Sequence, residues 1–302
     1  MLCIERSVRA LCRAHSKLTI QRSALAAALA FACWLSAQIT PAETVAVAES
    51  SPAAQQEATG AFPMDQLTEA AQAKLWPVIS SPSIYRRLPT EVVNCDRDMY
   101  LTLVRNPEIV VGMWKLMEVT ELDMRRSGPF TFDCDDKAGT TSQAELVYGT
   151  PNLHIFYADT LYEGSLFARP VNGRVVLLLR SEYYNDEHGR PQAKSVMDAF
   201  IRIDHAAAKL VARTMSPLVV RTADHNFSET FRFFARVQEA AEQNGPGMRQ
   251  LATRLENVEP ARQRQLADVA TLVDQRAAAR REQAAAQGGG SPAVSRAMEL
   301  RR

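Results

Sequence analysis

The alternation of apolar and polar residues between positions 118 and 204 predicts a series of short β-strands. The strand-like segments are residues 118–123, 130–134, 143–148, 152–158, 161–169, 174–184 and 193–204. Most of the intervening segments are short and polar, and Asn172-Gly173 is a strong hairpin signal. Antiparallel neighbours need only short turns, whereas parallel strands need crossovers of about a dozen residues. The pattern therefore predicts an antiparallel meander.

Upstream of the meander, the chain has one further strand pattern and two helix patterns. Residues 84–94 look like a strand that is interrupted at Pro89, because proline cannot donate to a sheet ladder. Asp96 or Asp98 can cap the helix that follows, and Pro107 suits the first position of another helix. We therefore expect a strand and two short helices before the meander.

Residues 205–244 return to helical periodicity. We expect a break near Pro217, with Asn226 as the N-cap of a second helix and Glu229 completing a capping box. The apolar face of this helix consists of Phe227, Phe231, Phe234, Val237 and Ala241. Such a face must be buried, and the meander is the only large surface available. The predicted fold class is α+β, with a curved antiparallel sheet of about seven strands wrapped around a long C-terminal helix.

This order of elements, over residues 83–244, resembles the START-like (helix-grip) superfamily, which includes polyketide cyclases and lipid-transfer proteins. In that superfamily the sheet curls around the last helix and leaves an apolar cavity for a lipid, sterol or aromatic ligand. Pro217 and residues 222–225 depart from the pattern, because they would kink or split the closing helix. The expected ligand-binding residues are Trp114, Phe156, Phe227, Phe231 and Phe234.

Residues 1–48 have the pattern of a secretory signal. Basic residues precede the uncharged segment 24–39, which is short of the roughly 20 apolar residues that span a membrane. Cleavage after Ala37, Ala42 or Ala48 predicts an exported protein, periplasmic or extracellular, with no transmembrane helix in the mature chain. An uncleaved anchor, a buried helix and a lipoprotein box ending at Cys33 are the alternatives.

Two cysteines, Cys95 and Cys134, lie beyond the predicted signal. In an oxidising compartment they are candidates for a disulfide. The closed loop of about 40 residues would contribute roughly 3–4 kcal/mol in the chain-entropy account. The alternative is a pair of buried free thiols, since cysteine is among the most buried residue types.

The composition divides the remaining chain into three regions. Residues 49–63 contain few bulky apolar residues, so we expect a disordered linker there. Residues 64–244 are expected to form a single α+β domain. Residues 245–302 predict a helical, partly disordered tail with eight arginines and four acidic residues after position 260. Its short apolar stripe suits either light docking on the domain or binding of a protein partner; the stripe is Leu266, Val269, Leu272 and Val273.

Chemically capable residues are scattered. We expect His154, beside Phe156, to be a packed histidine. The Asp-His pairs at 204–205 and 224–225 are expected to cap helices or form turns. Residues 133–136 are expected to form an acidic turn. The chain lacks a nucleophile elbow, a phosphate-binding loop, a zinc motif and a nucleic-acid motif, and its formal net charge is +1. We expect no cofactor, no metal and no nucleic-acid partner.

The sequence therefore favours an exported protein that binds a hydrophobic small molecule or lipid in a cavity between sheet and helix. A cyclase- or hydrolase-like enzyme using the same cavity is one alternative. An envelope interaction protein that binds a partner through residues 245–302 is the other.

Overall fold

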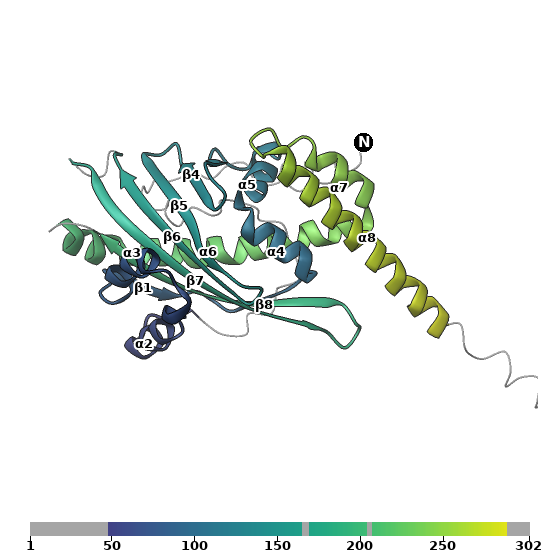
Figure 1. Ribbon diagram of the computed structural model, residues 1–302, viewed down its shortest axis with the longest axis horizontal. Helices are drawn as coiled ribbons and strands as arrows, with labels where there is room; N and C mark the ends of the chain where they lie inside the picture. The colour runs from purple at the N-terminus through teal and green to yellow at the C-terminus, as the bar shows by residue number, and fades with distance from the viewer. Residues whose placement is uncertain (1–47, 165–168, 204–206, 289–302) are drawn as a thin grey trace, which may run out of the picture.

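One antiparallel sheet of eight strands organises the molecule (Figure 1). The computed structural model describes residues 48–164, 169–203 and 207–288, with the backbone alone at 207–220 and 287–288. The predicted signal thus lies outside the described residues, except for Ala48. The strands are β1 (Ile84–Arg87), β2 (Glu91–Asn94), β3 (Asp123–Arg126), β4 (Thr131–Asp135), β5 (Thr140–Gly149), β6 (Leu153–Tyr162), β7 (Val171–Asn185) and β8 (Pro191–Ile203).

The sheet order is β1-β8-β7-β6-β5-β4-β3, and β2 also pairs with β8. Both β1 and β2 lie along the same side of β8, with Pro89 in the gap between them. The predicted interruption at that proline is confirmed. The strands from β3 to β8 follow one another as neighbours, so the predicted antiparallel meander is confirmed as well.

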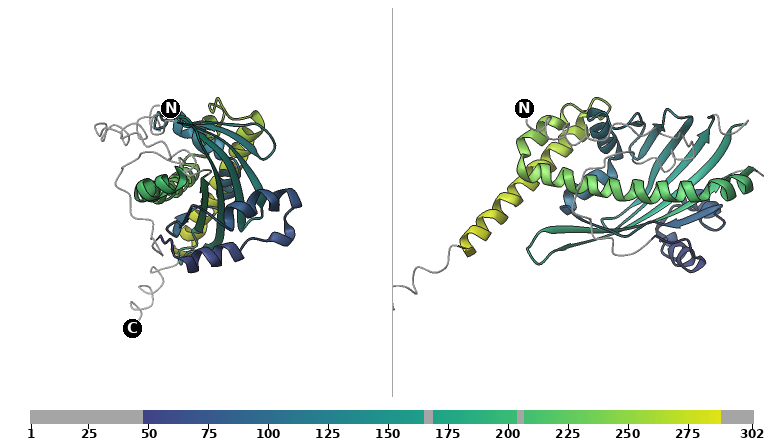
Figure 2. Two further views of the ribbon diagram at one scale, coloured as in Figure 1. Left: turned by 90° about the vertical axis from the view of Figure 1, so that its left-hand side faces the viewer. Right: turned by 180° about the vertical axis from the view of Figure 1, so that it is seen from behind.

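The helices cover both faces of the sheet and one end of it (Figure 2). The long helix α6 crosses one face, which we call the inner face, and α2 and α3 cover the outer face. None of the helices in the described ranges is both long and apolar enough to cross a membrane. The helices are α2 (Pro52–Gly60), the 3₁₀ helix η1 (Met64–Gln66), α3 (Glu69–Ile79), α4 (Arg97–Arg105), α5 (Pro107–Leu116), α6 (Ala207–Gln243), α7 (Gly245–Ala252) and α8 (Pro260–Gly288).

The predicted fold class, an α+β fold with a curved antiparallel sheet around a long helix, is confirmed. Local signals placed several elements correctly. Asp96 caps α4 by accepting a hydrogen bond from the backbone of Asp98, and Pro107 is the first residue of α5. Proline is favoured at that position because its missing N–H has no intrahelical partner to lose.

The apolar run Val175–Leu179 in β7 is explained by helices on both faces. Val176 and Leu178 pack in the cluster under α2 and α3, whereas Val175, Leu177 and Leu179 face α6. A strand buried on both faces loses the apolar–polar alternation of a half-exposed strand.

Three of the predicted strand boundaries are wrong. The segment 118–123 is not a strand, since β3 begins only at Asp123. Asn172-Gly173 lies inside β7, opposite Leu161 and Thr160 of β6, instead of forming a hairpin turn. Pairing of β6 with β7 over ten residues outweighs the local turn preference. Residues 161–162 therefore end β6 instead of beginning the separate strand predicted at 161–169. Residues 165–168 lie outside the described residues.

The prediction that the closing helix is broken is also wrong. The backbone of α6 is helical from Ala207 to Gln243, through both Pro217 and Asn226. A proline inside a helix costs about 3 kcal/mol. The apolar face of α6 is buried from Ala223 to Ala241, which favours one continuous helix. Asn226 therefore caps no helix.

The predicted disordered linker at 49–63 is in fact ordered around α2. Ser51 caps this helix, accepting a hydrogen bond from the amide of Ala54 at 3.1 Å. Ala54 and Ala58 are buried in the outer cluster, and Glu57 forms an ion pair with Arg87 at 3.0 Å. Alanine side chains let the helix approach the sheet closely, which a composition argument cannot detect because it counts only bulky apolar residues.

The tail predicted for 245–302 belongs to the domain as far as α8. Leu266, Ala270 and Val273 are buried in the same core as α4 and α6. Arg276 binds Asp96, the cap of α4, at 2.7 Å. Three of the four stripe residues, Leu266, Val269 and Val273, thus pack within the chain, which weakens the case for a partner there. Residues 289–302 lie outside the described part.

Candidate functional site: an apolar cavity under α6

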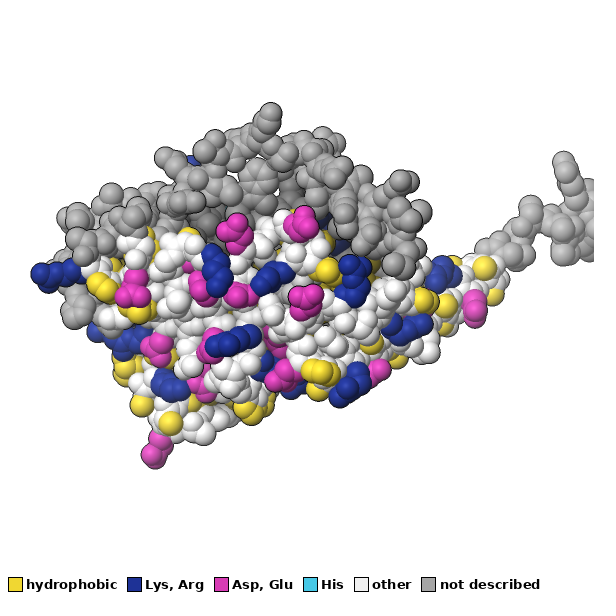
Figure 3. Space-filling view, turned by 90° about the horizontal axis from the view of Figure 1, so that it is seen from above, with side chains coloured by type: hydrophobic (Ala, Val, Ile, Leu, Met, Phe, Trp, Pro, Cys, Tyr) yellow, Lys and Arg dark blue, Asp and Glu magenta, His cyan; other side chains and the backbone are white. Residues whose placement is uncertain are grey.

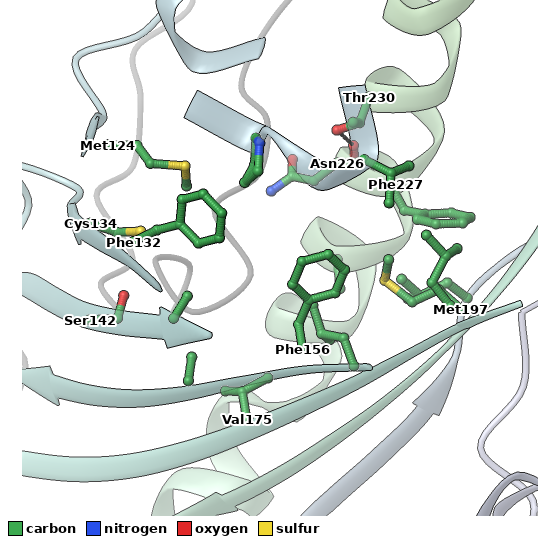
Figure 4. A pocket seen from close by; sticks show the side chains of 18 of the residues that line it. Met124, Phe132, Cys134, Ser142, Phe156, Val175, Met197, Asn226, Phe227 and Thr230 are labelled. Atoms are coloured by element: carbon green, nitrogen blue, oxygen red, sulfur yellow. Dashed lines mark hydrogen bonds between the residues drawn. The ribbon is translucent and has the colours of Figure 1, made fainter. Parts of the chain in front are cut away.

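A cavity of about 160 Å³ lies between the inner face of the sheet and α6 (Figure 4). Its walls come from β3 to β8, from α4 and α5, and from α6. The lining residues are Leu88, Leu103, Val104, Pro107, Leu122, Met124, Phe132, Cys134, Ser142, Ala144, Phe156, Tyr157, Ala158, Val175, Leu177, Leu179, Met197, Ala223, Asn226, Phe227, Thr230, Phe231 and Phe234.

The sheet register explains why space remains on the inner face. Ala144 of β5 pairs with Ala158 of β6, which in turn pairs with Val175 of β7. Side chains in directly opposed positions point to the same face, so two alanines meet on neighbouring strands. These small side chains leave space above the sheet at this point, and Phe132 and Phe156 also line that space.

The roof of the cavity is one face of α6. Its six lining residues follow one another at helical spacings of three, one, three, one and three: Ala223, Asn226, Phe227, Thr230, Phe231 and Phe234. The rings of Phe227 and Phe231 have centroids 4.5 Å apart, and those of Phe231 and Phe234 are 5.2 Å apart. Tilted aromatic contacts at such distances are favourable beyond simple burial, so the roof is a rigid aromatic row.

Four of the five expected ligand-binding residues line the cavity: Phe156, Phe227, Phe231 and Phe234. Trp114 is elsewhere; its ring packs on Phe233, on a different face of α6, with centroids 5.6 Å apart. Whether the four phenylalanines contact a ligand stays a prediction. The sequence reasoning missed Asn226 and Thr230, although both continue the i, i+4 spacing of the phenylalanine face.

The two candidate cysteines are free thiols, so the predicted disulfide does not form in this structure. Cys95 follows β2 at one side of the sheet, and Cys134 lies in β4 beyond β8, β7, β6 and β5. Bonded cysteines need Cα atoms within about 7 Å. Burial raises the pKa of Cys134, which lines the cavity, to about 12, and raises that of Cys95 well above its usual range. Both side chains are neutral near pH 7.

His154 is fully buried, and its Nε2 accepts a hydrogen bond from Arg105 Nε at 3.0 Å. Burial and the neighbouring positive charge of Arg105 lower the pKa of His154 to about 4. The imidazole is therefore neutral near pH 7 and packed, as the sequence predicted. It does not line the cavity.

The other candidates for chemistry have structural roles. Asp224 forms an ion pair with Arg86 at 2.5 Å, and His225 is exposed. Asp135 and Asp136 accept backbone hydrogen bonds at the turn between β4 and β5. The acidic turn predicted at 133–136 is thus only partly correct, because residues 133–135 belong to β4. Asp204 and His205 lie outside the described residues. The structure thus brings none of the described members of this set together into a catalytic site.

Helix α6 is tied to the β1/β2 side of the sheet. Besides the Arg86–Asp224 pair, Ser228 donates a hydrogen bond to Glu91 at 2.5 Å. On the opposite side, a second hollow of about 850 Å³ adjoins the cavity and shares three residues with it: Met124, Cys134 and Ser142. Charges of both signs line this hollow. Helix α6 is thus bonded to the sheet on the β1/β2 side, and the cavity adjoins polar space on the β3/β4 side.

Seen from above, the described surface carries basic and acidic side chains close together (Figure 3). Neither sign dominates this view. Binding of a polyanion depends on a concentrated basic patch. This face therefore gives no support to nucleic-acid binding.

Comparison with known proteins shows only distant similarity. No protein-family model and no curated protein matches the chain. Among solved structures, a conserved protein from Geobacillus kaustophilus is 10% identical over 49% of this chain and 93% of its own, with a TM-score of 0.37. The di-domain ARO/CYC protein BexL from the BE-7585A biosynthetic pathway is 16% identical over 53% of this chain and 52% of its own, with a TM-score of 0.29. A putative uncharacterized protein from Rhizobium leguminosarum is 10% identical over 48% of this chain and 97% of its own, with a TM-score of 0.27. Likenesses at these scores carry no argument about family or function.

Proposed function

We propose that the protein binds a hydrophobic small molecule, or the apolar part of a lipid, in the cavity under α6. The observation that carries the proposal is the cavity itself, which is lined mainly by apolar side chains of the sheet and of the aromatic row on α6. A preformed apolar cavity with few polar groups is the usual form of a site for such ligands. The order of elements and the helix gripped by the sheet support a place for the protein in the START-like superfamily.

The size of the cavity limits the ligand. Sites for drug-sized molecules occupy about 300–1,000 Å³, whereas an engineered cavity of about 150 Å³ holds benzene. A cavity of about 160 Å³ therefore encloses one ring or a short aliphatic chain. A longer molecule would have to extend into the adjoining polar hollow.

The lining favours binding over catalysis. None of the described residues that line the cavity is His, Asp, Glu, Lys or Arg. General acid–base catalysis needs a titratable group within hydrogen-bond reach of the reacting atom. A cyclase- or hydrolase-like activity therefore has less support than simple binding.

Filling the cavity tests the function. Ala158→Phe places a ring in the space above the paired alanines, and Ala138→Phe, at an exposed turn position, is the matched control. We expect toluene and octanoic acid to raise the melting temperature of the wild type and of the control but not that of Ala158→Phe. By mass action, a ligand at 100 times its dissociation constant adds about 2.7 kcal/mol to stability. Equal stabilisation of Ala158→Phe and wild type, or none of either, would refute the proposal.

We further propose that the protein is exported, on the basis of the basic and apolar segments in residues 1–48. Mass spectrometry of the protein recovered from a secreting host tests this directly. The expected N-terminus follows Ala37, Ala42 or Ala48. An intact N-terminus on cytoplasmic protein would exclude it.

A further inference from the structure

Asparagine is an unusual residue at the position that Asn226 occupies in α6. It lies in the middle of the continuous helix α6, where asparagine is a weak helix former and has no capping role. Its side chain is on the buried face of that helix, and the residue is 5% exposed. Its neighbours on the same face, Ala223, Phe227 and Phe231, are apolar. Neither helix formation nor apolar packing accounts for an amide here.

The amide of Asn226 is directed from α6 toward the space bordered by Phe132 and Phe156 (Figure 4). A side-chain amide has two donor hydrogens and two acceptor lone pairs, so a single protein partner does not exhaust it. Placing such a group in apolar surroundings costs free energy unless hydrogen bonds compensate. A cavity that only had to hold hydrocarbon would be served better by leucine at this position.

The other polar groups of the wall are less suited to meet a ligand. Thr230 donates its hydroxyl to the backbone oxygen of Asn226 at 2.7 Å. Tyr157 donates to Asp159 at 2.7 Å and packs in the outer cluster, and Cys134 is a neutral thiol. Ser142 lies on β5, at the side shared with the polar hollow. Among the described lining residues, Asn226 alone carries a side-chain amide, which offers both donors and acceptors.

We propose that Asn226 selects the ligand: the natural ligand is an aromatic ring or short aliphatic chain that carries one hydroxyl or carbonyl group bonded to this amide. The inference rests on the proposed function, because it concerns the same cavity. A volume of about 160 Å³ leaves room for one ring with one small polar substituent. The aromatic row of α6 contacts the apolar body, and the amide fixes its orientation.

The experiment compares p-cresol with toluene, which differ by one hydroxyl. Dissociation constants are measured by calorimetry or ligand-observed NMR on the full chain as wild type, Asn226→Leu and the control Asn185→Leu, which removes an exposed amide outside the cavity. One hydrogen bond has a net value that corresponds to about a tenfold change in affinity. We therefore expect Asn226→Leu to reduce the affinity for p-cresol relative to toluene about tenfold, and Asn185→Leu to leave that ratio unchanged.

Two additions keep the test decisive if Asn226→Leu does not fold. Asn226→Ala removes the same amide with less bulk and is expected to lower the ratio to a similar extent. In the wild type, the side-chain amide resonances of Asn226 are expected to shift with p-cresol and much less with toluene.

The outcomes separate this inference from the proposed function. If both probes bind the wild type, Ala158→Phe abolishes their binding, and the Asn226 variants keep the wild-type ratio, the role of Asn226 is overturned and the proposed function stands. If Asn226→Leu lowers the affinity for both probes equally, the role of Asn226 in selecting the ligand is also overturned. If the wild type binds neither probe, both proposals fail.

Discussion

Helices cover both faces of the sheet, but the side chains beneath them pack differently on the two faces. On the outer face, Phe200 is fully buried between Phe62 and Tyr85, with ring centroids 5.8 and 5.1 Å apart. On the inner face, α6 lies over paired alanines, Ala144 and Ala158, and a cavity of about 160 Å³ remains. The same strands supply both faces, because successive residues point to opposite sides.

Buried charge distinguishes the outer face of the sheet from the lining of the inner cavity. The carboxylate of Asp198 is fully buried on the outer face, where Tyr85, Arg87 and Arg180 donate hydrogen bonds to it at 2.7–2.8 Å. Arg87 and Arg180 also reach Glu57 on α2. Charge and aromatic packing thus hold α2 against the sheet, whereas none of the described residues that line the inner cavity is charged. The difference agrees with the proposal that the inner face serves binding.

Replacing one phenylalanine on each face is the strongest test of this difference. Phe200→Ala removes a fully buried ring from a filled core and should lower the free energy of unfolding by about 4 kcal/mol. Phe156→Ala removes a half-buried ring that already borders empty space, so we expect about 2 kcal/mol. Urea denaturation measures both changes. Equal losses would mean that the inner face is packed as tightly as the outer one.

The second prediction concerns the buried carboxylate. Asp198→Ala leaves Arg87 and Arg180 without their shared partner and should cost about 3 kcal/mol, the low end for breaking a buried pair, because Glu57 still binds both arginines. Toluene binding to the inner cavity should change little in any variant that stays folded. A variant with normal stability but weakened toluene binding would contradict the division of roles between the two faces.

The third and smallest effect is a pH dependence that arises from His154. Its pKa is about 4 in the folded protein, below the ordinary value of about 6.5 in an unfolded chain. Below pH 6.5 the unfolded chain takes up a proton that the folded protein does not, so stability falls as the pH falls toward 4. Between pH 7 and pH 5 the loss is about 2 kcal/mol.

The variant His154→Gln should lose about 2 kcal/mol less than the wild type between these pH values. The exposed His188 supplies the control, since His188→Gln should follow the wild-type pH profile. Chemical denaturation at pH 7 and pH 5 measures the difference. Parallel profiles for wild type and His154→Gln would show that this histidine is not held neutral.

Local chemistry was enough to predict many elements. The cap at Asp96, the helix start at Pro107 and the interruption at Pro89 depend on one residue and its own backbone, and all three are confirmed. The phenylalanine face of α6 was also visible as helical spacing, and three of its members line the cavity. The same local rules failed at Asn172-Gly173 and at Asn226, where pairing or packing over a longer stretch overrides a short-range preference.

What could be read from residue order was therefore the kind of each element, the antiparallel order of the strands and the side of α6 that must be buried. Three features depended on contacts between distant segments: the docking of α2 through small alanines, the burial of α8 in the main core, and the cavity. The cavity exists because the strand register sets Ala144 opposite Ala158 beneath the aromatic row of α6. No periodicity along the chain encodes that register, since it is set by pairing and packing among many strands at once.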